Sequence, residues 1–201
     1  NLLNIDTFNS NSSPNGVVNL VPESLNEDLA YAELDLFWTT NLASRVQLFK
    51  RVGGGQEVEV HTSEVVGGFA ADSFPLNTDQ ALRFRINRAT TFILRATSAG
   101  NTVAQQLEIG FAAPTVALSS NAQNNQMNLE PGQNYSELNL TWNLTNVVEI
   151  VSLVGVVGGN QPIEVDFGVA RPDSTQSRTI TVQPTENVSY IITVRNQDGI
   201  E

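Results

Sequence analysis

Few side chains in this sequence could act as acids, bases or nucleophiles. His61 is the only histidine, and there is no cysteine. A serine nucleophile with a histidine base would need that one residue in a positioned triad. His61 instead follows Glu57–Val60 on an expected strand, and no Gly-x-Ser-x-Gly turn occurs. We therefore expect a solvated strand histidine, no enzyme activity, and no zinc site, because zinc takes several His or Cys ligands.

Carboxylates are plentiful, with 21 Asp and Glu residues. The pairs Glu57/Glu59 and Glu164/Asp166 stand two residues apart, which on a strand puts both members on one outward face. Glycoside hydrolysis needs two carboxylates facing each other in a cleft, so we expect these pairs only to keep the strands soluble. Calcium needs oxygen ligands that converge from loops. The loop candidates for such a site are Asp72, Asp79, Asp166, Asp173 and Asp198. Without an Asp-x-Asp-x-Asp-Gly loop we expect no cofactor, and calcium stays an open alternative.

Four arginines form a local basic stripe in this acidic chain: Arg83, Arg85, Arg88 and Arg95. The stripe is a candidate surface for an acidic protein partner or an anionic glycan. The alternative is that the guanidinium groups pair with carboxylates on the neighbouring strand, as opposite charges across a sheet do.

Aromatic residues offer a second kind of binding surface. Phe37, Phe49 and Phe69 are expected to be exposed and are candidates for stacking on sugar rings. Single exposed aromatics are common, however, and need no functional explanation. Trp38 and Trp142 have inward parity on their strands, so we expect both in hydrophobic cores.

Composition limits the function classes. The 201 residues carry a net charge of −11, with a pI of about 4.4. Such a chain repels phosphate backbones, so we expect no nucleic-acid partner. No apolar run approaches the ~18 residues that span a membrane. Charged residues are 15% of the chain and the polar remainder is rich in Asn, Gln, Ser and Thr. This composition favours an extracellular or cell-surface location.

An internal repeat sets the domain organisation. Glu33–Trp38 and Glu137–Trp142 share the pattern Glu-Leu-x-Leu-x-Trp, and Gly53-Gly54 matches Gly158-Gly159. The spacing of about 100 residues is the size of a whole domain. We predict two domains, residues 1–112 and 113–201.

Alternation of apolar and polar residues predicts the elements that position these side chains. Leu34, Leu36 and Trp38 alternate with Glu33, Asp35 and Phe37, as on a half-buried strand. About seven such strands per 100 residues, with turn residues between them, predict an all-β chain of two tandem antiparallel β-sandwiches of immunoglobulin-like type. Single strands near 56–66 and near 126–130 are part of this prediction.

Three motifs carry a resemblance to a known family. Leu34–Asn41, Thr91–Gly100 and Tyr190–Gly199 resemble the bacterial immunoglobulin-like domains, which carry a Leu-x-Trp-x-x-x-Asn strand and later an aromatic strand running into Asn-x-x-Gly. The resemblance covers nearly the whole chain twice. It implies a cell-surface adhesin or secreted protein, and phage virion proteins carry such domains too.

The two predicted domains differ in their last strand. The first continues past Gly100 into Val103–Phe111, its expected last strand, whereas Glu201 follows closely on the equivalent turn of the second. We therefore expect the second domain to lack its last strand in this sequence. Either the sequence was cut at a convenient boundary, or another chain supplies the strand by β-augmentation.

The function expected from these observations is a non-catalytic structural or adhesive module of a larger extracellular or particle-surface protein. The alternatives are a phage virion component (tail, fibre or decoration), a carbohydrate-binding accessory module, and a strand-exchanging filament subunit. A protein or glycan partner and neighbouring domains are expected, with no membrane span.

Overall fold

The computed structural model describes residues 2–12, 16–21, 30–60, 65–66, 76–78, 81–165 and 177–201. These residues form strands and turns and no helix, so the predicted all-β class is confirmed. None of them forms a helix long and apolar enough to cross a membrane. The chain divides into two compact units that meet in sequence between Ala112 and Ala113.

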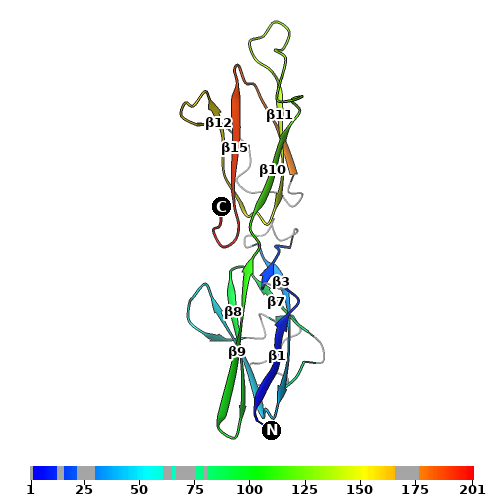
Figure 1. Cartoon of the computed structure of the whole chain (residues 1–201), viewed down its shortest axis with the longest axis vertical. Helices are drawn as coiled ribbons and strands as arrows, with labels where there is room; N and C mark the ends of the chain where they lie inside the picture. The colour runs from blue at the N-terminus through cyan, green and yellow to red at the C-terminus, as the bar shows by residue number, and fades with distance from the viewer. Residues whose placement is uncertain are drawn as a thin grey trace. The chain divides into compact units, whose positions relative to one another are not determined.

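The first unit consists of two sheets (Figure 1). One has the order β1-β3-β7-β6, with all pairs antiparallel. Its strands are β1 (Asn4–Ser10), β3 (Ala32–Asn41), β7 (Leu82–Ile86) and β6 (Val65–Val66). The other has the order β2-β9-β8-β4-β5, in which only the short pair of β2 with β9 is parallel. Its strands are β2 (Val17–Val18), β9 (Asn101–Phe111), β8 (Thr90–Ser98), β4 (Arg45–Val52) and β5 (Val58–Glu59).

The two sheets of the first unit pack face to face through one hydrophobic core. On β3, Leu34, Leu36 and Trp38 are fully buried while the residues between them face outward. Phe84 of β7 and Phe92 of β8, which belong to different sheets, bring their ring centroids to 5.5 Å. This arrangement is a β-sandwich, and it confirms the predicted burial of Trp38.

The described residues of the second unit repeat the arrangement with fewer strands. One antiparallel sheet has the order β10-β11-β14, and the other has the order β13-β12-β15. The strands of the first are β10 (Thr115–Ser120), β11 (Leu138–Thr145) and β14 (Ser177–Val182). Those of the second are β13 (Ile163–Glu164), β12 (Glu149–Val157) and β15 (Val188–Arg195).

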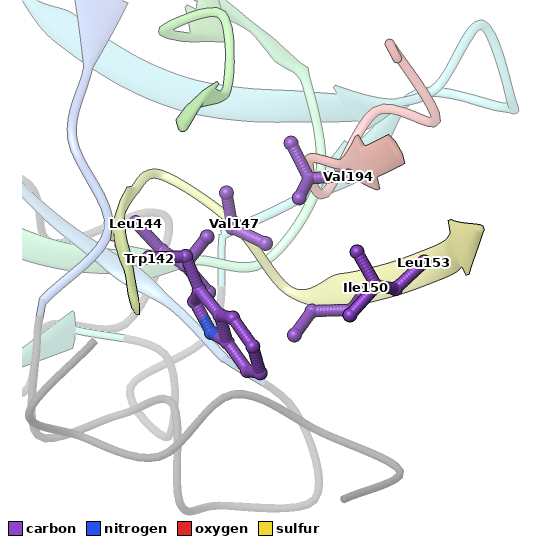
Figure 2. Packing of buried hydrophobic residues seen from close by; sticks show 6 residues of the cluster. All are labelled: Trp142, Leu144, Val147, Ile150, Leu153 and Val194. Carbon is purple, nitrogen blue, oxygen red and sulfur yellow. The ribbon is translucent and has the colours of Figure 1, made fainter. Parts of the chain in front are cut away.

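A separate cluster of buried side chains fills the second sandwich (Figure 2). Its members are Trp142, Leu144, Val147, Ile150, Leu153 and Val194. They come from β11, β12, β15 and the turn between β11 and β12, so both sheets contribute. Trp142 is 1% exposed, which confirms its predicted burial in a core.

Matching turns accompany the matching cores. Gly53 and Gly54, after β4, have φ of 54° and 77°, and Gly158 and Gly159, after β12, have φ of 52° and 80°. Each turn is closed by a hydrogen bond to a strand carbonyl, from Gly55 N–H to Val52 at 2.9 Å and from Asn160 N–H to Val157 at 2.8 Å. Two successive positive φ values define the tight hairpin turn that suits the twist of β-strands, and glycine adopts them without steric cost.

Two strand predictions were wrong. Residues 127–130 form no strand: Leu129 is 61% exposed, and nearby turns satisfy the backbone, as where Ser136 Oγ donates to the Asn128 carbonyl. The expected single strand near 56–66 is divided between the two sheets. Its first part, β5, pairs with β4, and its second part, β6, pairs with β7. An edge segment that changes sheets in this way cannot be one straight strand.

Candidate functional site

The outer face of β3 and β7 carries the main cluster of charged side chains. Glu33 lies directly opposite Arg85, and Asp35 lies directly opposite Arg83. These residues alternate with the buried Leu34 and with other core residues, so the alternation that fills the core also turns the charges outward. We call these four residues the β3–β7 charge ladder.

The β3–β7 charge ladder is held by good hydrogen-bond geometry. The guanidinium group of Arg83 donates to both carboxylate oxygens of Asp35, at 2.8 and 3.1 Å. Glu33 Oε1 accepts a hydrogen bond from Arg85 Nε at 3.3 Å, and Glu33 Oε2 lies 3.6 Å from Arg83 Nη1. Arg85 also stacks on the ring of Tyr31, at 4.4 Å from the ring centroid. Both arginines and both carboxylates are thus occupied by one another.

The electrostatics of Asp35 follow from this geometry. The hydrogen bond from Arg83 lowers the pKa of the Asp35 carboxyl, the positive charge of Arg83 lowers it further, and partial burial opposes the change. The same hydrogen bond with Asp35 raises the pKa of the Arg83 guanidinium group. Asn11 fixes Asp35 from the other side: its amide donates to Asp35 Oδ2 at 3.1 Å, and its Oδ1 accepts the Asp35 N–H at 2.8 Å. Because the pair is solvent-exposed, its contribution to stability is small.

The other two arginines of the predicted stripe lie elsewhere. Arg95 is on β8, in the opposite sheet, where it pairs with Glu57 and stacks over Phe49 at 4.5 Å from the ring centroid. Arg88 is exposed in the turn between β7 and β8. The structure therefore brings Arg83 and Arg85 together and separates both from Arg95, so the four do not form one continuous surface.

Sequence reasoning named the arginines but missed their partners. The signal in the sequence was the alternation of apolar and polar residues. It places Glu33 and Asp35 on the outer face of one strand, and Arg83 and Arg85 on the outer face of another. Tyr31 and Glu57 gave no such signal, because both lie just outside strands and reach their arginines through the local path of the chain.

The predicted aromatic candidates are not brought together either. Phe37 is 37% exposed on the outer face of β3, whereas Phe49 is half-buried on β4, in the other sheet, beneath Arg95. Phe69 lies outside the described residues. Phe37 and Phe49 therefore do not combine into one stacking platform.

The remaining candidates for chemistry fall mostly on parts of the chain without a described structure. His61, Asp72, Asp79, Asp166 and Asp173 all lie there. Asp198 is described and stands in a turn, where its backbone N–H donates to Asn196 Oδ1 at 3.0 Å. Among the described residues, no three His, Cys, Asp or Glu side chains gather to hold a metal ion.

The outer face of β3 and β7 offers charged groups for non-covalent contacts. The β3–β7 charge ladder presents alternating positive and negative groups to solvent, fixed in position by one another. A comparison with known sequences adds no name to this description, since no protein-family model matches the chain and no curated protein matches it.

Proposed function

We propose that the chain is a non-catalytic structural and adhesive module, made of two immunoglobulin-like sandwiches, within a larger extracellular or particle-surface protein. The observation that supports this most is the pairing of strands. In the first unit the order β1-β3-β7-β6 against β2-β9-β8-β4-β5 corresponds to the two-sheet arrangement of immunoglobulin-like domains, extended at its edges. The strands described for the second unit follow the same order and are fewer.

The chemistry of the outer faces supports the same proposal. On the β3–β7 charge ladder the carboxylates and guanidinium groups satisfy each other, with both oxygens of Asp35 bound by Arg83. Such cross-strand pairs help to hold the two strands together, and the face would present a fixed polar pattern to a protein or glycan partner. A surface adhesin or secreted protein is the setting that we favour, and a virion component is the variant that shares this architecture.

Mechanical unfolding tests the structural role. If each tryptophan core belongs to a separately folded sandwich, stretching a single molecule should give two force peaks, each releasing roughly 30 nm of chain, since extended chain spans about 3.3–3.6 Å per residue. Trp142→Ala should remove or weaken one peak and leave the other unchanged. Extension without force peaks, or a single peak, would argue against a spacer of two independent sandwiches.

A further inference from the structure

Strand β8 carries an isoleucine that is buried on the outer face of its sheet. Phe92 and Leu94 point into the core, where the ring of Phe92 meets that of Phe84 from the other sheet. Ile93 stands between them and points outward, because side chains alternate along a strand. The outer face of an antiparallel sheet is ordinarily in contact with water, yet Ile93 is only 2% exposed. Other side chains on that face must therefore cover it.

Three described side chains lie next to Ile93 on this face. Phe49 of β4 lies directly opposite it on one side, and Gln106 of β9 lies directly opposite it on the other. Arg95 is two residues further along β8, so it points to the same face. Its guanidinium group lies over the Phe49 ring, at 4.5 Å from the ring centroid. Phe49 and Ile93 thus form a small apolar pair outside the main core, with a cation over its aromatic member.

The guanidinium group of Arg95 is held from the edge of the sheet. Glu57, the residue before β5, forms an ion pair with Arg95, and the two side chains are half-buried. Glu59, on β5 itself, accepts a hydrogen bond from Gln47 Nε2 of β4 at 2.9 Å. The contacts of Arg95 therefore join three strands, from β8 across Phe49 of β4 to the start of β5. We call Phe49, Glu57 and Arg95 the β5 clasp.

The strand that the β5 clasp holds is short. β5 has 2 residues, and among the described strands it pairs only with β4, through two residue pairs. One more backbone hydrogen bond follows, from the Val60 N–H to the Leu48 carbonyl at 3.0 Å. Edge segments with so few contacts are the parts of a protein that open locally. The side-chain contacts of Glu57 and Glu59 are thus a large share of what keeps β5 in place.

The described residues of the second unit contain no such clasp. Neither the ion pair nor the aromatic ring is kept there: the matches of Phe49, Arg95 and Glu57 are Val154, Thr193 and Pro162. Ile191, the match of Ile93, is 50% exposed. β15 also has a neighbouring strand on one edge only among the described residues. Because the two units differ in both respects, variants of the first unit are needed to isolate the clasp.

We propose that the β5 clasp is a salt-sensitive device that closes the edge of the first sandwich. When it is closed, the ion pair of Arg95 with Glu57 holds β5 against β4 and keeps Phe49 and Ile93 out of water. When it opens, β5 leaves the sheet, this apolar pair is uncovered and the backbone of β4 is freed at Leu48. Salt favours opening, because a half-exposed ion pair is weakened by screening. This inference goes beyond the structural role proposed above and does not depend on it.

Amide hydrogen exchange, followed by NMR, measures the opening of β5 at one backbone group, the Val60 N–H. The second unit supplies an internal reference, because the Val165 N–H donates to the Leu153 carbonyl at 2.8 Å in the matching place. The quantity to compare is the ratio of the Val60 rate to the Val165 rate in the whole chain. Effects of salt and pH on intrinsic exchange largely cancel in this ratio.

The variants separate the ion pair from the cation over the ring. Arg95→Thr, which introduces the residue of the second unit, should raise the ratio about tenfold, because both contacts are lost. Glu57→Gln should raise it about two- to fivefold, because only the ion pair is lost. The double variant should match Arg95→Thr, since Glu57 acts through Arg95.

Arg51→Thr is the matched control. Arg51 lies on β4, two residues from Phe49, so it points to the same face and its loss changes the charge equally. The ratio should change by less than about twofold, because Arg51 is not part of the clasp. An effect as large as that of Arg95→Thr would overturn the proposal, because it would show that any loss of positive charge on this face opens β5.

Salt provides the second test. Raising NaCl from about 0.1 M to about 1 M shortens the screening length from about 10 Å to about 3 Å. The ratio should rise about twofold in the unaltered protein and stay constant in Glu57→Gln. Salt dependence that persists in Glu57→Gln would overturn the proposal. So would an unchanged ratio in Arg95→Thr, a double variant whose effect exceeds that of Arg95→Thr, or faster exchange throughout β8 and β9, which would mark general destabilisation.

Discussion

Strands β8 and β15 have related sequences and the same place in their sandwiches, but different burial. Ile93 and Ile191 are the clearest pair, at 2% and 50% exposed. Both are isoleucines on the same face of a strand, and each has a neighbour on one side, Phe49 of β4 or Val154 of β12. Only Ile93 has Gln106 of β9 on the other. The difference shows that the burial of a strand residue depends on its neighbours across the sheet as much as on its own hydrophobicity.

The largest expected effect comes from removing either core tryptophan. Trp38→Ala and Trp142→Ala should each destabilise their own sandwich by about 3–5 kcal/mol, since both side chains are fully buried. The chain has 2 tryptophans, one in each unit, so the remaining one reports on the unaltered sandwich. Denaturant titration followed by tryptophan fluorescence should show an unchanged midpoint for that reporter. A shift of the reporter's midpoint by a comparable amount would mean that the two cores unfold as one.

Two matched substitutions that shorten a side chain compare how well the cores beneath β8 and β15 are buried. Leu94→Ala should cost about 2–5 kcal/mol, because Leu94 is 0% exposed and its loss leaves a cavity. Ile192→Ala, at the matching half-buried position, should cost less, about 1 kcal/mol, because less area is removed from water. The two values come from chemical denaturation of each variant. Equal costs would show that the second core is as well covered as the first.

Sequence patterns predicted the parts of the structure that depend on one strand at a time. The parity of Leu34, Leu36 and Trp38 sufficed to place them in a core, because alternation on a strand is a local property. Pairing of the arginines with carboxylates on a neighbouring strand was one of two alternatives, but Asp35 was not foreseen as the partner of Arg83, since that depends on which strand lies next to β7.

Features that depend on several strands were missed. The division of the segment near 56–66 between two sheets depends on β4 and β7, which lie on either side of it in the sequence. The backbone bonds of the stretch near 126–130 are satisfied by turns, which an apolar pattern does not reveal. Among the described residues β15 has a neighbouring strand on one edge only, and the exposure of Ile191 that accompanies it required the structure.

The glycine turns provide a comparison in which the two units should behave alike. Gly54→Ala and Gly159→Ala should each cost about 1 kcal/mol, because φ of 77° and 80° strains any residue with a Cβ. No atom lies within 4 Å of a Cβ built at either position, so steric contacts add nothing. The difference between the two costs, measured by denaturant titration, should be near zero. Unequal costs would indicate that the turns match in geometry but not in their contribution to stability.

The smallest expected effect concerns the β3–β7 charge ladder, which has a weaker counterpart in the second unit. There, Asn139 and Thr141 occupy the β11 positions of Asp35 and Phe37, and Thr141 Oγ1 lies 2.8 Å from Thr179 Oγ1. A hydroxyl pair does not titrate at acid pH, whereas the Asp35 carboxyl does. The folded-state pKa of Asp35 is lowered below 3.8 by Arg83.

The stabilisation from Asp35 is therefore present above pH 3.8 and is lost as the pH falls through the lower folded-state value. Asp35→Asn should reduce stability slightly at pH 7 and should reduce the acid sensitivity of the first unit. Thr141→Val, the control on β11, should leave acid sensitivity unchanged. The measurement is the denaturant midpoint of the first unit, followed by Trp38 fluorescence, at several pH values between neutral and acid. If Asp35→Asn left the acid dependence of the first unit unaltered, the ladder would contribute no proton linkage and its pairing would matter only for the surface that it presents.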